Sequence, residues 1–395
     1  MGSSGAGRGR VAIVSHGFFP TVGGSERYHL FTARALADAF DVEVFTSDRN
    51  LPPATPASSE RVAVGPVGVH YLPSRNRGAE RFIRPTALWR ALRKFGPDVV
   101  WGNHPSPTAD VAGLFALATR RPWVATYHAD VSTGRWSHRR YLGWEMWLLR
   151  RARCVLVTST RYRDILVRRG IPENRIVVVP PGPYIGDGVL PTVASPGAGA
   201  RPEAPFLFVG ALDAAHAYKR LDLLLQTLAS LAQDGTTPVL EVVGDGDRRA
   251  EMERLAGTLG ISDRVRFLGR LSDAEVAERF ASARALIVPS PDSTEGFGSV
   301  AVEAMHYGCP VVVSSNVAVG DLLTGYGAAA VFDPARPGSL RDTLRRLVTD
   351  AAWRASLAEG THAAAASLQW PPLLAAMTAP VRALARSRRS TGPAR

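Results

Sequence analysis

Lysine is almost absent from this chain of 395 residues. Of its 47 Lys and Arg side chains only Lys94 and Lys219 are lysine, and with 35 Asp and Glu the formal net charge is +12. A basic surface attracts nucleic acid, anionic lipid or a phosphorylated substrate. No zinc-ligand spacing and no nucleic-acid-binding motif accompanies the charge, so composition alone selects none of these partners. Each of the two lysines is rare enough to be examined as a functional residue.

Cysteine and long apolar runs are also scarce. Cys154 and Cys309 lie in or beside apolar runs, so we expect two buried, reduced side chains. No run approaches the ~20 apolar residues of a membrane-spanning helix. Residues 1–10 are rich in Gly, Ser and Arg without an apolar stretch, which predicts no signal peptide. We expect this segment and the basic tail from Arg386 to be disordered, and the protein to be cytoplasmic.

Short apolar runs recur along the chain with helical stretches between them. Hydrophobic content of 46% and charged content of 21% are those of a globular protein, and the length suits two domains. The runs are rich in Val and do not alternate, which is typical of parallel strands buried on both faces. The predicted strands are 11–14, 42–46, 98–101, 123–126, 154–158, 176–179, 206–209, 239–243, 265–268, 285–288, 311–314 and 329–332.

The predicted fold class is α/β, with two facing Rossmann-like doubly wound domains. Residues 187–205 are rich in Gly, Pro, Ala and Ser and read as a linker. The N-terminal domain is therefore expected over 10–186 and the C-terminal domain over 206–367. Leucines at helical spacing predict a helix over 221–231, and Ser272 with Glu275 predicts a capping box at the start of another.

The most informative segment is 285–314. An apolar run is followed by the Gly296-Phe297-Gly298 turn and a helix, with Glu295 and Glu303 eight positions apart. A helix N-terminus preceded by small residues offers free N–H groups and a positive dipole end to a phosphate. Phosphate on the amides and hydroxyls on the two carboxylates would describe a nucleotide-sugar site.

This segment, with the Gly308-Cys309-Pro310 step into the next strand, resembles the Glu-x7-Glu donor motif of retaining GT-B glycosyltransferases, the family 4 type (group 1). The resemblance runs from about residue 11 to about residue 380. It implies that a C-terminal helix, 368–385, crosses back to the N-terminal domain. It also implies a nucleotide-diphosphate sugar as donor substrate, with no metal or other cofactor required.

The resemblance further implies roles for individual residues. Gly23 and Gly24 follow the first strand, and His128 follows the strand that ends at Thr126, where α/β folds bind ligands. The catalytic residues implied are His128, Glu295 and Lys219. The acceptor contacts implied are Glu26, His104 and Asp130. The donor contacts implied are Gly23, Gly24, Gly210, Lys219, Arg220, Gly244, Arg266, Leu268, Gly296, Phe297, Gly298, Ser299, Val300 and Glu303.

One position departs from the family pattern. Ala211 stands where an arginine that grips the diphosphate is usual, which puts one donor contact in doubt. Arg220 or His216 could replace it.

The segment 135–151 mixes arginine with tryptophan and tyrosine. Such a helix could lie on an anionic membrane surface. The favoured alternative is a helix that packs its aromatic side chains on its own sheet and exposes its arginines.

The predicted function is retaining transfer of a hexose from a UDP- or GDP-sugar to a hydroxyl of a glycan, a lipid or a small molecule. Peripheral contact with the inner face of the membrane stays open. The alternatives are a sugar-nucleotide epimerase or phosphorylase of the same fold and a non-catalytic nucleotide-sugar-binding module. A nucleic-acid-binding protein is the alternative that rests on charge alone.

Overall fold

The computed structural model describes residues 8–19, 24–48, 61–77, 80–128, 136–183, 203–291 and 295–390. The chain divides into two compact units: unit 1 runs to Pro180 and resumes at Pro371, and unit 2 spans Pro181–Trp370. Sequence placed these divisions at 186 and 368. The predicted linker 187–205 lies outside the described residues except for 203–205.

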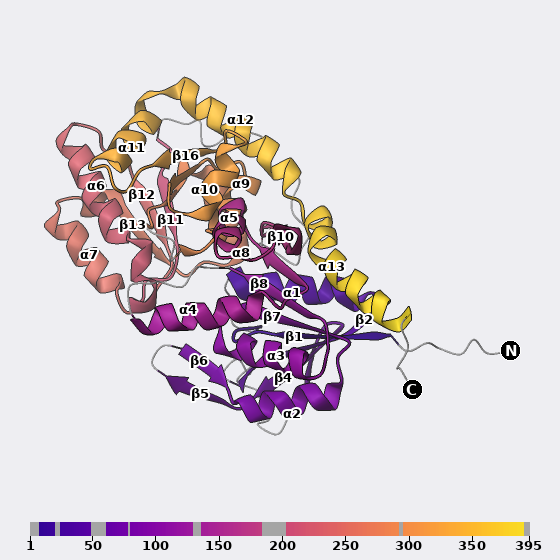
Figure 1. The fold of residues 1–395 in the computed structure, drawn as a ribbon. Helices are drawn as coiled ribbons and strands as arrows, with labels where there is room; N and C mark the ends of the chain where they lie inside the picture. Colours follow the sequence, from indigo (N-terminus) through magenta and orange to yellow (C-terminus); the bar gives the residue numbers. More distant parts are fainter. Residues whose placement is uncertain are drawn as a thin grey trace. The chain divides into compact units, whose positions relative to one another are not determined.

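Unit 1 is built on an eight-stranded sheet in the order β10-β9-β8-β7-β1-β2-β4-β3 (Figure 1). Every neighbouring pair is parallel except β3 with β4. The central strands are almost fully buried, as their Val-rich runs predict. The strands are β1 (Gly9–Val14), β2 (Phe40–Ser47), β3 (Val62–Val64), β4 (Val67–Leu72), β7 (Val99–His104), β8 (Trp123–Tyr127), β9 (Cys154–Val157) and β10 (Ile176–Val178), with a separate hairpin of β5 (Ser74–Arg77) and β6 (Glu80–Ile83).

The helices of unit 1 cover both faces of this sheet (Figure 1). The C-terminal helix α13 (Trp370–Ser390) packs on the first helix, because Thr32 donates a hydrogen bond to Met377 and Arg382 donates one to the carbonyl of Ala35. The predicted return of the chain to the N-terminal domain is confirmed. The other helices are α1 (Gly24–Ala37), α2 (Pro85–Phe95), α3 (Pro107–Ala118), α4 (Trp136–Leu149) and α5 (Thr160–Arg168), with a 3-10 turn at Glu173–Arg175.

Unit 2 holds a six-stranded, wholly parallel sheet in the order β13-β12-β11-β14-β15-β16. Its strands are β11 (Phe206–Val209), β12 (Leu240–Val243), β13 (Val265–Gly269), β14 (Ala285–Val288), β15 (Val311–Ser314) and β16 (Ala329–Phe332). Its helices are α6 (Leu221–Gln233), α7 (Arg249–Thr258), α8 (Asp273–Ser282), α9 (Ser299–His306), α10 (Ala318–Thr324), α11 (Ser339–Thr349) and α12 (Ala351–Ser367), with 3-10 turns at Ala214–Lys219 and Ser262–Arg264.

All twelve predicted strands are present in the two sheets. The leucines of α6 are buried against unit 2, and the capping box of Ser272 and Glu275 opens α8. Cys154 and Cys309 are both free and buried, as expected. The sequence did not reveal β3 to β6, because β3, β5 and β6 are only three or four residues long and the apolar residues of β4 are interrupted by Gly68 and His70.

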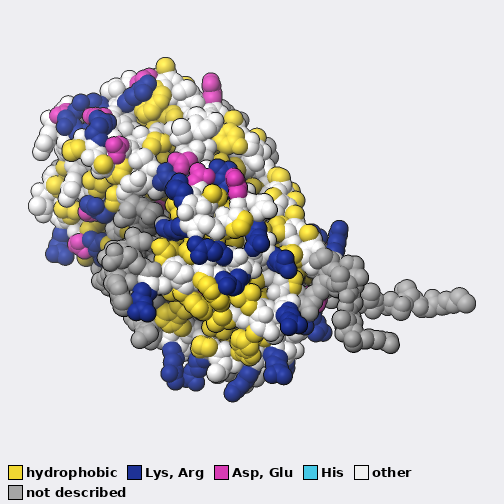
Figure 2. Space-filling view, viewed as in Figure 1, with side chains coloured by type: hydrophobic (Ala, Val, Ile, Leu, Met, Phe, Trp, Pro, Cys, Tyr) yellow, Lys and Arg dark blue, Asp and Glu magenta, His cyan; other side chains and the backbone are white. Residues whose placement is uncertain are grey.

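Figure 2 shows the surface of one face. Over α2, α3 and α4, Lys and Arg side chains surround hydrophobic ones, with few Asp and Glu among them. Over the described residues, no helix is long and apolar enough to cross a membrane.

Glycines bring two loops of unit 2 together at the carboxyl ends of β11 and β12. The amide of Gly210 donates to Val243 at 3.0 Å, and that of Leu212 donates to Asp245 at 3.0 Å. Gly244 has φ +135°, and a Cβ there would overlap the carbonyl oxygen of Gly210. The two loops therefore pack backbone to backbone, which fixes the sheet edge where α/β folds bind ligands.

Gly244→Ala should lower the free energy of unfolding by about 3 kcal/mol or more, since strain at this φ adds to a backbone clash. Gly235→Ala is the matched control, because Gly235 also has positive φ (+78°) but open space around it. That variant should cost about 1 kcal/mol. Urea unfolding measures both, and equal losses would contradict the close approach.

Candidate functional site

The carboxyl edge of the second sheet carries a glycine turn that starts α9. Gly296 and Gly298 have φ of +67° and +82°, and Gly298 is the N-cap of the helix that begins at Ser299. The carbonyl of Phe297 accepts a hydrogen bond from Val319 at 3.0 Å, which holds the turn on the loop after β15. The N–H of Ala301 bonds the carbonyl of Gly298 at 2.9 Å, so the N–H groups of Ser299 and Val300 precede the hydrogen bonds of the helix, whose dipole is positive at this end.

Glu295, directly before this turn, is held by a lysine from the loop after β11. The ammonium of Lys219 donates to both carboxylate oxygens, at 2.8 and 3.0 Å, and Ser290 donates to the same carboxylate at 3.0 Å. The lysine side chain is 17% exposed and the glutamate 6%. Sequence reasoning named Lys219 and Glu295 separately and missed both their pairing and Ser290. The position of Ser290, two residues after β14 ends, was the available signal.

Two neighbours shape this ion pair. A Cβ on Gly210 would lie 2.8 Å from Cδ of Lys219, so the glycine makes room for the lysine stem at the end of β11. Burial raises the pKa of Tyr218, and the charges of Glu295 and Asp213 raise it further, which keeps the phenol neutral. The pair is therefore enclosed by the protein on several sides.

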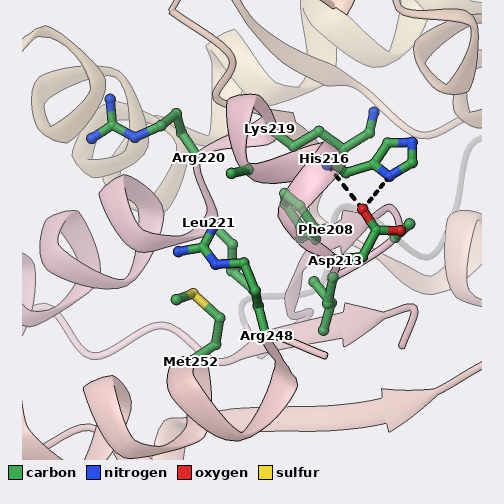
Figure 3. Close-up of a pocket in the computed structure, with 11 residues that line it drawn as sticks. Phe208, Asp213, His216, Lys219, Arg220, Leu221, Arg248 and Met252 are labelled. Carbon is green, nitrogen blue, oxygen red and sulfur yellow. Dashed lines mark hydrogen bonds and ion pairs between the residues drawn. The ribbon is translucent and has the colours of Figure 1, made fainter. Parts of the chain in front are cut away.

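A small pocket lies beside Lys219 (Figure 3). Arg220 also lines this pocket, but its guanidinium bonds Asp222 at 2.9 Å and points away from Lys219 and His216. Ala211 lines the pocket, so no guanidinium comes from that position. The remaining residues around it are Phe208, Leu212, Asp213, His216, Ala217, Leu221, Arg248 and Met252.

Two basic side chains of this pocket are candidates to replace the missing arginine. Nδ1 of His216 bonds Asp213 at 2.7 Å. The pKa of Asp213 is lowered: burial acts to raise it, but the hydrogen bonds and the charge of His216 outweigh burial. Arg248, which sequence reasoning missed, follows the Gly-Asp-Gly-Asp turn and pairs with Glu251 at 2.8 Å. In an arginine-rich sequence, nothing marked Arg248 as a functional residue.

The other predicted donor residues of unit 2 are in β13 and α9. Arg266 is exposed and pairs with Glu241 at 3.3 Å, away from the buried ion pair. Leu268 precedes Gly269, whose carbonyl accepts from Gly244 at 2.8 Å. Ser299, Val300 and Glu303 are half-buried on α9.

The carboxyl edge of the first sheet brings histidines together. His128 follows β8 and is half-buried, with its ring 4.7 Å from that of Tyr28 and 5.4 Å from that of His29 on α1. Burial, then the neighbouring His29 and His16, lowers the pKa of His128 well below its usual value. The imidazole is therefore neutral at neutral pH and can both donate and accept a hydrogen bond.

Glu26 lies near this edge on α1. A Cβ on Gly17, in the loop after β1, would overlap its carboxylate, and Ser25 donates to that carboxylate at 3.0 Å. Gly24 is exposed at the start of the same helix. Gly23 and Asp130, the other predicted contacts of this unit, lie outside the described residues.

His104 is inside unit 1 rather than at its surface. Its side chain is fully buried, and Nδ1 lies 3.7 Å from Asp110 and 3.5 Å from Glu145. This position argues against the predicted acceptor contact. Burial raises the pKa of Asp110 to about 6, while the charge of His104 opposes the shift and that of Glu145 adds to it. Among the described residues, no group of three or more His, Cys, Asp or Glu side chains could hold a metal ion.

Comparison with known proteins agrees with this arrangement. Residues 23–182 match the glycosyl transferase 4-like domain, and residues 200–363 match the glycosyl transferases group 1. Over 386 residues the chain is 30% identical to the D-inositol 3-phosphate glycosyltransferase of Salinispora tropica, covering 88% of this chain and 78% of that protein.

The fold is similar to that of sucrose-phosphate synthase from Thermosynechococcus elongatus, with TM-score 0.75 and 22% identity over 96% of this chain and 100% of that one. It is also similar to Anabaena HepE in complex with UDP-glucose, with TM-score 0.70 and 18% identity over 95% and 99% of the two chains. The chain belongs to the group 1 (family 4) glycosyltransferases, and is a transferase with the GT-B fold.

Asp110 should make the stability of unit 1 depend on pH. Because its pKa rises from 3.8 to about 6 on folding, the stabilisation is complete below pH 3.8 and is lost as the pH rises through about 6. Asp110→Asn should remove about 2–3 kcal/mol of that decline between pH 4 and 7, as measured by urea unfolding. Asp164→Asn, at a half-exposed carboxylate, is the control. An unchanged pH profile in the Asp110 variant would contradict the assignment.

Proposed function

We propose that this protein transfers a hexose from a nucleotide-diphosphate sugar to an acceptor hydroxyl with retention of the anomeric configuration. The observation that carries the proposal is the enclosed Lys219–Glu295 ion pair beside the N-terminus of α9. A lysine, a carboxylate and free helix N–H groups at one sheet edge provide for both parts of such a donor, its diphosphate and its sugar.

The donor would be held as follows. The N–H groups at the Gly298–Val302 start of α9, chiefly those of Ser299 and Val300, and the ammonium of Lys219 bind the diphosphate and stabilise the charge that develops on the departing phosphate. Fixed charges of this kind are often the largest contribution to catalysis. Glu303 holds ribose hydroxyls, while Glu295 and His128 orient the transferred sugar. His216, whose ring lies beside Lys219 in Figure 3, or Arg248, which lines the same pocket, would supply the contact that Ala211 lacks.

The chemical step needs no protein nucleophile. The bond between the anomeric carbon and the phosphate oxygen breaks, and the acceptor oxygen bonds to the same face of that carbon. The acceptor proton passes to the departing phosphate oxygen. Helix dipole and lysine carry the phosphate charge, so the proposal includes no metal or other cofactor.

The substrates proposed follow from the relatives. A uridine donor, UDP-glucose first, is suggested by the complex of HepE, and a GDP-sugar is the alternative. D-inositol 3-phosphate is the first acceptor to test, since the Salinispora tropica relative is named for it. Other small molecules, glycan ends and lipids follow. We place the reaction in the cytoplasm, in contact with the inner face of the membrane.

A second candidate is a non-catalytic module or an epimerase of the same fold. Alanine at position 211 and the mutual neutralisation of Lys219 and Glu295 favour weaker donor binding than the family pattern implies. Incubating the protein with donor alone separates the candidates. An epimerase converts the nucleotide sugar without acceptor, a module releases nothing, and a transferase needs the acceptor.

Removing both partners of the ion pair should separate activity from folding. Lys219→Met or Glu295→Gln alone should reduce transfer about 100-fold or more and also lower stability, because each leaves one enclosed charge unpaired. The double variant should regain most of the stability and none of the activity. Thermal unfolding and product formation measure the two effects. Lys94→Met, at the only other lysine, is the control and should keep full activity. Full activity in the double variant would remove the pair from the mechanism.

Nucleotide binding should be visible without any acceptor. A ligand at ~100 times its dissociation constant adds about 2.7 kcal/mol to the free energy of unfolding. Among UDP, GDP, ADP and TDP, we expect UDP to raise the melting temperature selectively, and Lys219→Met to abolish the shift. If no nucleotide or nucleotide sugar shifts the wild type, the donor site assigned here is wrong.

A further inference from the structure

Helix α4 exposes aromatic residues and buries an acid. Trp144 and Trp147 are each 38% exposed, whereas Glu145 between them is 0% exposed. A helix that only covers its own sheet turns its largest apolar side chains inward. The prediction that this helix packs its aromatic residues on the sheet therefore holds only in part, because Trp144 lies near buried Asp110 while more than a third of each tryptophan is exposed.

The inward and outward faces of α4 have separate reasons. Inside, Glu145 lies 3.5 Å from Nδ1 of His104, and Asp110 of α3 lies 3.7 Å from the same nitrogen. Outside, the rings of Trp144 and Trp147 stack 5.1 Å apart at 16°. The contacts of Glu145 fix the orientation of the helix. Trp144 lies at the margin, near Asp110, and the exposed parts of the two stacked rings form an apolar surface.

A hollow lined by arginines adjoins the C-terminal end of α4. It opens where β8 and β9 begin, at the opposite edge of the sheet from His128. None of the residues that line it is acidic. This arginine hollow is formed by Arg120, Arg121, Arg150, Arg151, Arg153 and Arg175, with Ala116, Leu117, Pro122 and Trp123 between them.

Three of these guanidinium groups bond backbone carbonyls, which orients them without neutralising their charge. Arg150 donates to the carbonyl of Arg169 at 2.6 Å, Arg151 to that of Trp147 at 2.7 Å, and Arg175 to that of Arg150 at 3.0 Å. Arg121 pairs with Asp98 at 3.5 Å. Bonds to carbonyls leave the positive charge in place, so the hollow is suited to an anion with several charges.

The tryptophan pair and the hollow form one continuous surface. The guanidinium of Arg151 lies 3.9 Å above the ring of Trp147. Arg150 also lines a second, open hollow with Leu142, Met146 and Arg168. Figure 2 shows hydrophobic and basic side chains next to one another on the face over α3 and α4.

We propose that Trp144, Trp147 and the arginine hollow dock unit 1 on an anionic lipid bilayer. Indole rings favour the boundary between acyl chains and headgroups, and guanidinium groups pair with lipid phosphates. Docking at this edge of the sheet leaves the opposite edge, with His128, open to substrates. A nucleic acid would engage the arginines but gives no reason for an exposed Trp pair next to Met146 and Leu142.

The inference rests on the membrane location in the proposed function and is independent of hexosyl transfer. Binding to vesicles is measured by sedimentation, with the full chain and without donor or acceptor. We expect binding to phosphatidylcholine vesicles that contain phosphatidylglycerol, little binding to phosphatidylcholine alone, and a fall in binding as salt rises. If the wild-type chain transfers a hexose but does not bind these vesicles, the proposed docking surface is wrong and the proposed function stands.

Variants assign the contact to the surface. Trp144→Ser with Trp147→Ser, and separately Arg120→Gln with Arg153→Gln, should each weaken vesicle binding about tenfold or more. Arg254→Gln with Arg264→Gln removes the same charge from exposed sites of unit 2 and should change it by less than about twofold. Equal effects of the two arginine pairs would overturn the proposal. So would tighter binding of duplex DNA than of vesicles, if the same variants abolished it. Circular dichroism confirms that each variant is folded.

Discussion

The ion pair between Lys219 and Glu295 is the contact on which the candidate donor site depends. It joins loops 76 positions apart, one following β11 and one following β14, at the shared carboxyl edge of a parallel sheet. The glycines around it serve the same end: Gly210 makes room for the lysine stem, and Gly298 lets α9 start directly after the acid. Removing either charge would leave the other enclosed without its ion-pair partner, so the two loops at this edge are stable only when both charges are present.

Most of the framework could be predicted from sequence, because buried parallel strands leave a local pattern. Each of the twelve Val-rich runs is a strand, and the Gly-Phe-Gly turn does precede a helix. The pairing of Lys219 with Glu295, the assistance of Ser290 and the position of Arg248 depend on how distant loops meet, which no local pattern encodes. His104 shows the same limit, since its place at the end of a strand suggested an acceptor contact, whereas the side chain is buried beside Asp110 and Glu145.

Arginine replaces lysine almost everywhere, and the two cations behave differently in the two units. The one lysine at the donor site is a compact charge held by a single carboxylate. Among the arginines of the hollow in unit 1, Arg150, Arg151 and Arg175 bond carbonyls and keep their charge, and Arg151 also stacks on Trp147. Composition reports only a net charge of +12, whereas the structure separates a site for one ligand from a broad surface.

The chain passes between its units twice, at Pro180–Pro181 and at Trp370–Pro371. Both passages are fastened together within unit 2, because the ring of Trp370 fills the space beside Gly182 and its indole donates to the carbonyl of Pro183. The two segments that cross between the units therefore contact each other and cannot move independently at this point. A substitution at Trp370 would remove this contact, and the two crossing segments would then be free to move separately.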